Sequence, residues 1–156
     1  MIVLFIIVAI VVMLYFLGRK SVHHEILIHA SPEKVWSVLI DTDSYEDWNP
    51  VMKLVEGEVI EGNKVKYQFT QDAENVSEIP SNVKRIIPQK LLNQGGGLPF
   101  VITFDHQYIL EPSGDGTRLT IHEDYGGIYV NFWNPAPVEA AYGRLNEAIK
   151  QRAESL

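Results

Sequence analysis

The chain contains no cysteine, so it forms no disulfide and offers no thiolate for catalysis or metal binding. It is also poor in basic residues, with 13 Lys and Arg against 20 Asp and Glu and a formal net charge of -7. The basic residues are scattered, whereas nucleic-acid binding requires a basic stripe that displaces counterions. We therefore expect no nucleic-acid partner. A length of 156 residues suits one domain with a single core.

The sequence also lacks the common motifs of catalytic, phosphate-binding and metal sites. It has no Gly-x-Ser-x-Gly elbow, and no Lys-Ser/Thr follows Gly95-Gly96-Gly97, which we interpret as a mobile loop near a pocket rim. The stretch HHEILIH (23–29) is not H-E-x-x-H, and on a strand His24 and His29 would point to opposite faces. We interpret these histidines as a solvated cluster and expect neither a metal site nor a cofactor.

One long apolar run stands out, from Ile2 to Leu17. With Met1 and Gly18 it gives a helix of about 27 Å, at the short end for crossing a bilayer. No basic residue precedes the run and no Ala-x-Ala follows it, which favours a membrane anchor over a cleaved signal peptide. The run also has no polar face, which argues against a buried core helix. We expect a transmembrane anchor over residues 1–18.

Charges next to this run predict its orientation. Arg19 and Lys20 follow it directly, so the positive-inside tendency places the rest of the chain on the cytoplasmic side. The expected organisation is a single-pass membrane protein with a polar linker over residues 19–24 and a ligand-binding domain over residues 25–156.

The rest of the chain predicts two short helices, a run of strands and a final helix. The strand EILIHA (25–30) precedes a helix that Ser31 caps and Pro32 opens, and DTDSYEDW (41–48) predicts a second short helix. Five β-rich segments follow. Turn formers separate them at residues 61–63, 75–80, 95–97 and 113–116.

The last helix, capped by Asn134 and opened by Pro135, carries an apolar stripe: Val138, Ala141, Tyr142, Leu145, Ala148 and Ile149. Gly143 costs this helix about 1 kcal/mol relative to Ala unless something packs closely there. An antiparallel sheet with helices on one side is an α+β fold. The stripe must pack on the concave face of the sheet, and space left between them forms a ligand cavity.

Two stretches carry a family resemblance. HASPEKVWSVLIDTDSYEDWNP (29–50) and FDHQYILEPSGDGTRLTIHEDYGGIYV (104–130) resemble the START-like/SRPBCC superfamily, in particular its polyketide cyclase/dehydrase group, which is related to the pollen allergen fold. The resemblance covers residues 25–156. It implies a Bet v 1-like helix-grip fold: a curved seven-stranded antiparallel sheet around a long C-terminal helix, with two short helices after the first strand and an apolar cavity. Members bind lipids, quinones, hormones and polyketides, and a few are enzymes.

Strand alternation supplies candidate cavity residues. If the last hairpin pairs Leu110 with Leu119, then Tyr108 faces Ile121 and His106 faces Glu123. The pair of His106 and Glu123 is a candidate general base with its orienter, a contact for a ligand's polar head, or a structural cross-strand pair. The full set of expected ligand-binding residues is Trp36, Trp48, Tyr67, Phe69, Phe104, His106, Tyr108, Ile121, Glu123, Tyr125, Tyr142 and Leu145.

Aromatic residues on the helices leave alternatives open. Trp36 and Trp48 seat the short helices across the sheet, with ligand contact as the alternative. Phe132 and Trp133 either cover the cavity entrance or lie at the lipid interface, where aromatic rings are favoured.

The apolar run at the start of the chain and what the family resemblance implies together give three expected functions. The first is a membrane-anchored protein that binds an apolar small molecule such as a lipid, a quinone or a polyketide-like compound. The second is an enzyme of the cyclase/dehydratase kind, using His106, Glu123 and a tyrosine, although these residue types are too generic to favour it. The third is an accessory subunit of a membrane protein complex, with a vestigial cavity.

Overall fold

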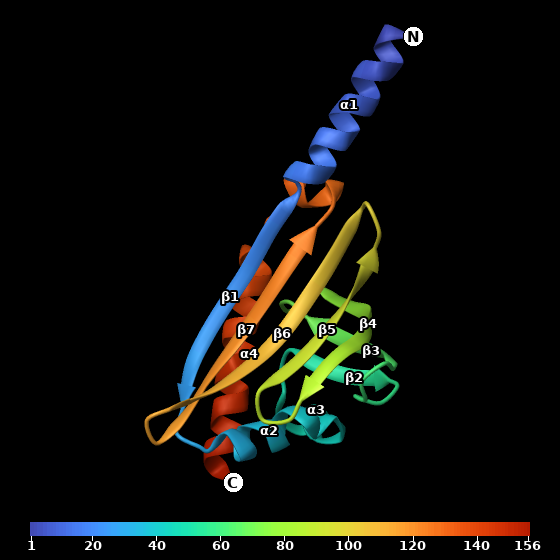
Figure 1. The fold of residues 1–156 in the computed structure, drawn as a ribbon. Helices are drawn as coiled ribbons and strands as arrows, with labels where there is room; N and C mark the ends of the chain where they lie inside the picture. The colour runs from blue at the N-terminus through green and yellow to red at the C-terminus, as the bar shows by residue number, and fades with distance from the viewer.

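The computed structural model describes residues 1–156 and contains a seven-stranded antiparallel sheet (Figure 1). The strands are β1 (Arg19–Ile28), β2 (Met52–Glu56), β3 (Lys64–Thr70), β4 (Val76–Ile87), β5 (Leu91–Leu98), β6 (Ile102–Ser113) and β7 (Gly116–Gly126). Their order in the sheet is β1-β7-β6-β5-β4-β3-β2, so every pair except β1 with β7 joins consecutive strands. This is the expected α+β helix-grip arrangement.

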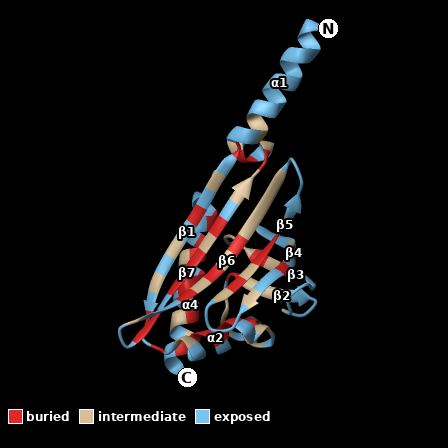
Figure 2. Cartoon of the chain, viewed as in Figure 1, coloured by how far each residue is buried: buried red, intermediate tan, exposed pale blue.

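The helices lie at the two ends of the sheet and along its concave face. They are α1 (Ile2–Leu17), α2 (Pro32–Ile40), α3 (Tyr45–Trp48) and α4 (Ala136–Ser155), with short 3-10 helices η1 (Thr42–Ser44) and η2 (Ile128–Phe132). Figure 1 shows α4 running along the sheet from η2, near α1, to α2 at the opposite end. The buried residues of Figure 2 follow the sheet and α4, whereas α1 is pale blue, or exposed, along most of its length.

Helix α4 begins at Ala136 with Pro135 as its N-cap, one residue later than the predicted cap at Asn134. The Asn134 side chain accepts a hydrogen bond from the Ala136 amide at 3.2 Å. The imidazole of His24 lies over Gly143, where an added Cβ would be 3.2 Å from its Nε2, and Asn146 donates to the His24 carbonyl at 3.0 Å. The close packing expected at Gly143 is therefore present. The interpretation of His24 as solvated is wrong, because its ring is held between β1 and α4.

The register of the β6–β7 hairpin is also confirmed. Leu110 pairs with Leu119, Tyr108 with Ile121, and His106 with Glu123. All three pairs have buried members, since this face of the two strands points toward α4. The short turn after Ser113 fixes this register, and the apolar alternation selects the buried face.

Residues 19–24 form a strand instead of the expected linker. They belong to β1 and pair with β7 from Arg19 opposite Gly126 to His24 opposite Ile121. Within this stretch Val22 is buried at 1% exposure while its neighbours Ser21 and His23 are exposed. The single apolar residue in a polar context concealed the two-residue period that predicts a strand.

Two expected loops are also strands. Gly95, Gly96 and Gly97 lie inside β5, where a Cβ on Gly96 would be 3.1 Å from the Phe104 ring, so the glycine makes room for that ring. The turn expected over residues 75–80 is instead the start of β4, with Pro80 opposite Lys66. This end of β4 is largely exposed, and its side chains therefore lack the apolar alternation that marks a strand.

The apolar run at the start of the chain forms α1, a helix of 16 residues and about 24 Å. None of its residues is buried. Neither α1 nor any other helix has the combination of length and hydropathy needed for a membrane span. The structure therefore does not support the transmembrane helix expected over residues 1–18.

Helix α1 is fixed to the domain. Gly127 donates a backbone hydrogen bond to the Gly18 carbonyl at 2.9 Å, and the Asn131 side chain donates to the Leu14 carbonyl at 2.7 Å. The ring of Tyr15 lies 5.5 Å from that of Phe100, in the β5–β6 turn. Gly18 and Gly127 meet so closely that a Cβ on Gly18 would overlap the Gly127 carbonyl. Helix α1 therefore continues into β1 with η2 packed against the junction.

Candidate ligand-binding cavity

A cavity of about 460 Å³ lies between the first half of α4 and the sheet. Its 14 lining residues, 8 of them hydrophobic, are Phe69, Gln71, Ser77, Glu78, Ile79, Pro80, Gly97, Ile102, Phe104, Glu123, Tyr125, Trp133, Val138 and Tyr142. The cavity lies toward the α1 end of the domain, because Gly97 and Ile102 flank the β5–β6 turn and Trp133 directly follows η2. The Trp133 ring lies 4.5 Å from that of Tyr125.

One carboxylate is buried in the cavity wall. Glu123, on β7, has a side chain only 5% exposed. Its Oε2 accepts a hydrogen bond from the Tyr125 hydroxyl at 2.5 Å and another from the Tyr142 hydroxyl on α4. His106 Nδ1, on β6, lies 3.6 Å from the same oxygen. Three elements therefore converge on Oε2, while Oε1 receives no hydrogen bond.

This environment keeps Glu123 ionised. Burial raises the pKa of the carboxyl, but hydrogen bonding and attraction from His106 and the hydroxyls of Tyr125 and Tyr142 outweigh it, so the pKa lies below its usual value. Burial and the adjacent Glu123 charge raise the pKa of Tyr125 and of Tyr142 above the usual value of a phenol. Both tyrosines therefore stay protonated and act as donors to Glu123.

The cluster contains no metal-binding arrangement. The chain has no group of three or more His, Asp or Glu side chains placed to hold a metal ion. The His106 ring stands edge-on to the rings of Tyr108 at 4.6 Å and Tyr142 at 5.2 Å. Its Nε2 is buried without a hydrogen-bond partner. The chemistry available to the site is therefore proton acceptance or hydrogen bonding by Glu123 within an apolar cavity.

The structure places five of the expected ligand-binding residues on the cavity wall: Phe69, Phe104, Glu123, Tyr125 and Tyr142. His106 lies behind Glu123 and does not line the cavity. Five others lie in the hydrophobic core: Trp36, Tyr67, Tyr108, Ile121 and Leu145. Trp48 packs on Tyr45 and donates to Ser44 at 3.0 Å, away from this cavity. Phe132 is 74% exposed beside Trp133, which lines the cavity.

Several lining residues were not expected at the site. Ser77, Glu78, Ile79 and Pro80 belong to the start of β4, and Gly97 and Ile102 flank the β5–β6 turn. The sequence interpretation placed most of these residues in turns or loops. A signal was present in Val138, which belongs to the apolar stripe of α4 and lies one helical turn before Tyr142.

A family model described as "Polyketide cyclase / dehydrase and lipid transport" matches residues 19–156. The chain belongs to this family. The resemblance found in the sequence is thereby confirmed, and the match begins at Arg19, the first residue of β1. Membership of this family supports a ligand-binding or cyclase role. No curated protein matches the chain significantly in sequence.

Solved structures share the fold at low sequence identity. The Zhui aromatase/cyclase from Streptomyces sp. R1128 superposes with a TM-score of 0.71 at 18% identity, over 87% of this chain and 94% of its own. Protein CV1439 from Chromobacterium violaceum gives 0.71 at 15% identity, over 86% and 98%. Ara h 8.0201 gives 0.66 at 14% identity, over 88% and 99%. At these identities the likeness shows the fold alone.

Proposed function

We propose that this polyketide cyclase/dehydrase family member binds an apolar small molecule in the cavity between α4 and the sheet, at a membrane surface to which α1 attaches it. The cavity carries the proposal. Its volume of about 460 Å³ falls within the usual range for small-molecule sites, which are concave and mainly apolar with few polar groups. Glu123 is its one deeply buried charged group.

Membrane attachment rests on the surface of α1. Its 16 residues are all apolar, none is buried, and no polar stripe interrupts them on any side of the helix. A protein partner on one side would leave the other sides in water, whereas hydrocarbon covers the whole circumference. We propose that α1 enters the apolar layer of a membrane and that Arg19 and Lys20 hold the domain at the cytoplasmic surface.

The cavity lies close to this attachment. Phe100, Tyr129 and Phe132 are at least half exposed and sit on the β5–β6 turn and on η2, the two segments that contact α1. Exposed aromatic rings favour the membrane interface. Because the cavity wall continues from these same segments through Ile102 and Trp133, an apolar ligand has a short path between lipid and cavity.

A fluorescent apolar probe tests ligand binding. The full chain in mild detergent is titrated with Nile red, and the variant Ile102→Trp places an indole at the cavity wall. We expect Nile red affinity to fall at least about tenfold. Ile87→Trp makes the same change at an exposed site on β4 outside the cavity and should change affinity less than about twofold. Equal affinity in all three proteins would refute cavity binding.

A cyclase or dehydratase is the second candidate function. The observation that favours it is an ionised carboxylate with one free oxygen in the cavity wall, since such a group can accept a proton from a bound substrate. Native mass spectrometry of the purified chain separates the two candidates. A compound recovered unchanged after incubation supports binding, whereas conversion that Glu123→Gln abolishes supports the enzyme. A stable protein partner with an empty cavity would instead support the accessory-subunit role.

A further inference from the structure

The deepest polar part of the cavity presents hydrogen-bond acceptors. The hydroxyl protons of Tyr125 and Tyr142 are both directed to Glu123 Oε2, so these phenols offer only oxygen lone pairs to a ligand. Oε1 of Glu123 receives neither of these bonds and is a further acceptor. A ligand group placed there must therefore supply the proton.

The charges around the cavity also favour a ligand group that donates a hydrogen bond. No Lys, Arg or His is among its lining residues, which include the carboxylates of Glu123 and Glu78. Glu78 is exposed at the rim, 3.8 Å from Lys66 Nζ. Two other cations near the rim are held by backbone carbonyls: Lys20 donates to Trp133 and Arg144 to Gln71. The side-chain donors that line the cavity outside the Glu123 cluster, Gln71, Ser77 and Trp133, are uncharged and less buried than Glu123, and the Gln71 amide already donates to Asp72.

We infer that the cavity selects apolar ligands that carry a hydrogen-bond donor, either a neutral hydroxyl or a protonated amine, and that it rejects ligands with a carboxylate. Glu123 Oε1 accepts the bond from the ligand, and the apolar wall of Ile79, Ile102, Phe104 and Val138 surrounds its body. A carboxylate ligand would instead bring a second negative charge beside buried Glu123, and no Lys, Arg or His lines the cavity to pair with that ligand. This inference rests on the proposed function and specifies the class of ligand.

Three probes with the same ring system and different head groups test it: 2-naphthylmethanol, 2-naphthylmethylamine and 2-naphthoate. Each competes with Nile red on the full chain in mild detergent at about neutral pH, where the amine is protonated and the acid is ionised. We expect the alcohol and the amine to displace Nile red at concentrations at least about tenfold lower than the naphthoate. Binding that persists in Ile102→Trp is subtracted as binding outside the cavity.

Two variants identify the responsible carboxylate. Glu123→Gln should bring the three probes to within about threefold of one another, chiefly by strengthening naphthoate binding. Glu78→Gln removes the exposed carboxylate at the rim and should leave the ranking unchanged. The wild-type ranking is decisive by itself, so the test stands even if Glu123→Gln fails to fold.

The outcomes separate this inference from the proposed function. Naphthoate that competes as well as the other two probes in the wild type, or a ranking that persists in Glu123→Gln, overturns the inference while Nile red still reports a ligand cavity. Nile red binding that is insensitive to Ile102→Trp overturns the proposed function, and the inference with it.

Discussion

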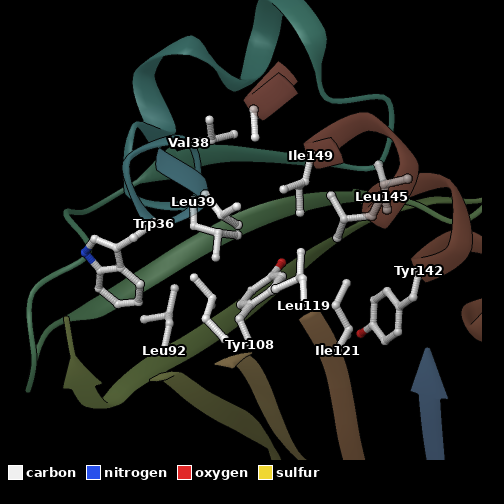
Figure 3. Close-up of a cluster of buried hydrophobic side chains, with 14 of the residues drawn as sticks. Trp36, Val38, Leu39, Leu92, Tyr108, Leu119, Ile121, Tyr142, Leu145 and Ile149 are labelled. Atoms are coloured by element: carbon white, nitrogen blue, oxygen red, sulfur yellow. The ribbon is translucent and has the colours of Figure 1, made fainter. Parts of the chain in front are cut away.

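The space between α4 and the sheet has two halves that differ in packing. In the half near the C-terminal end of α4, Leu145 and Ile149 pack against Leu39 of α2 and Leu119 of β7, and all four are at most 1% exposed. Figure 3 shows these side chains filling the space between the helices and the sheet. In the half near η2, Val138 and Tyr142 face a cavity of about 460 Å³.

The position of α2 explains this difference. Helix α2 contacts α4, β6 and β7 and adds Val35, Trp36, Val38 and Leu39 to the core. At the other end, η2 turns toward α1 and places only Val130 in a buried position. Without a second helix to supply aliphatic side chains, aromatic rings and Glu123 line the space without filling it. A second helix, α2, packs beside α4 at only one end of the sheet, and the cavity lies at the other end.

The largest expected change in stability comes from a substitution in the packed half. Leu119→Ala removes a fully buried side chain surrounded on all sides, and we expect it to lower the free energy of unfolding by about 2–5 kcal/mol. The matched truncation Ile102→Ala, on the cavity wall, should cost about 1 kcal/mol or less, since this half-buried side chain loses fewer contacts. Urea denaturation measures both. Equal losses would mean that the two halves are packed alike.

The comparison also shows which part of the site the sequence predicts. Alternation and the short hairpin turn identified the inward face of β6 and β7 with its pairs, and Phe104, Glu123 and Tyr125 on that face do line the cavity. Tyr108 and Ile121 share the same face but lie in the solid core. Period and register assign a residue to a face, whereas its packing depends on where α2 crosses that face, and no local pattern encodes this.

Three strand segments that the sequence analysis predicted as a linker, a turn or a loop were missed for a different reason. The predicted linker, the turn over residues 75–80 and the loop at Gly95–Gly97 are all sheet segments whose backbone pairing is regular. Their side chains are polar, small or exposed, so the sequence shows no apolar period there. Residues 77–80 and Gly97 from two of these segments nevertheless line the cavity, and this part of the cavity wall was therefore the least predictable part of the site.

A smaller loss of stability is expected when the hydroxyl of either of two buried tyrosines is removed. Tyr142→Phe removes a donor to the ionised Glu123 and should cost about 1.5–3 kcal/mol of unfolding free energy. Tyr67→Phe removes an acceptor for the neutral Gln94 amide, at 2.9 Å, and should cost about 0.5–1.5 kcal/mol. Thermal and urea unfolding of the two variants give the ratio. A Tyr67→Phe loss as large as that of Tyr142→Phe would show that the Glu123 charge adds nothing to its hydrogen bonds.

The smallest expected effect is the pH dependence of the free energy of unfolding that Glu123, in the cavity half, produces. The groups that face Glu123 are His106 and Tyr108 on β6, Tyr125 on β7 and Tyr142 on α4. Because the pKa of Glu123 is lower in the folded than in the unfolded chain, its ionisation stabilises the fold fully above the unfolded pKa of about 4.3, and this contribution is lost as the pH falls through the lower folded value.

The variant Glu123→Gln isolates this contribution from that of other acidic groups, such as Asp72 and Asp105, whose pKa is also lowered. We expect the stability of the wild type relative to Glu123→Gln to be constant between about pH 7 and pH 5.5 and to decline below about pH 4.5. Urea denaturation at a series of pH values measures the difference. A relative stability that rises on acidification would mean that burial dominates and that Glu123 binds a proton more readily in the folded chain, which would also remove the anion on which the head-group selection depends.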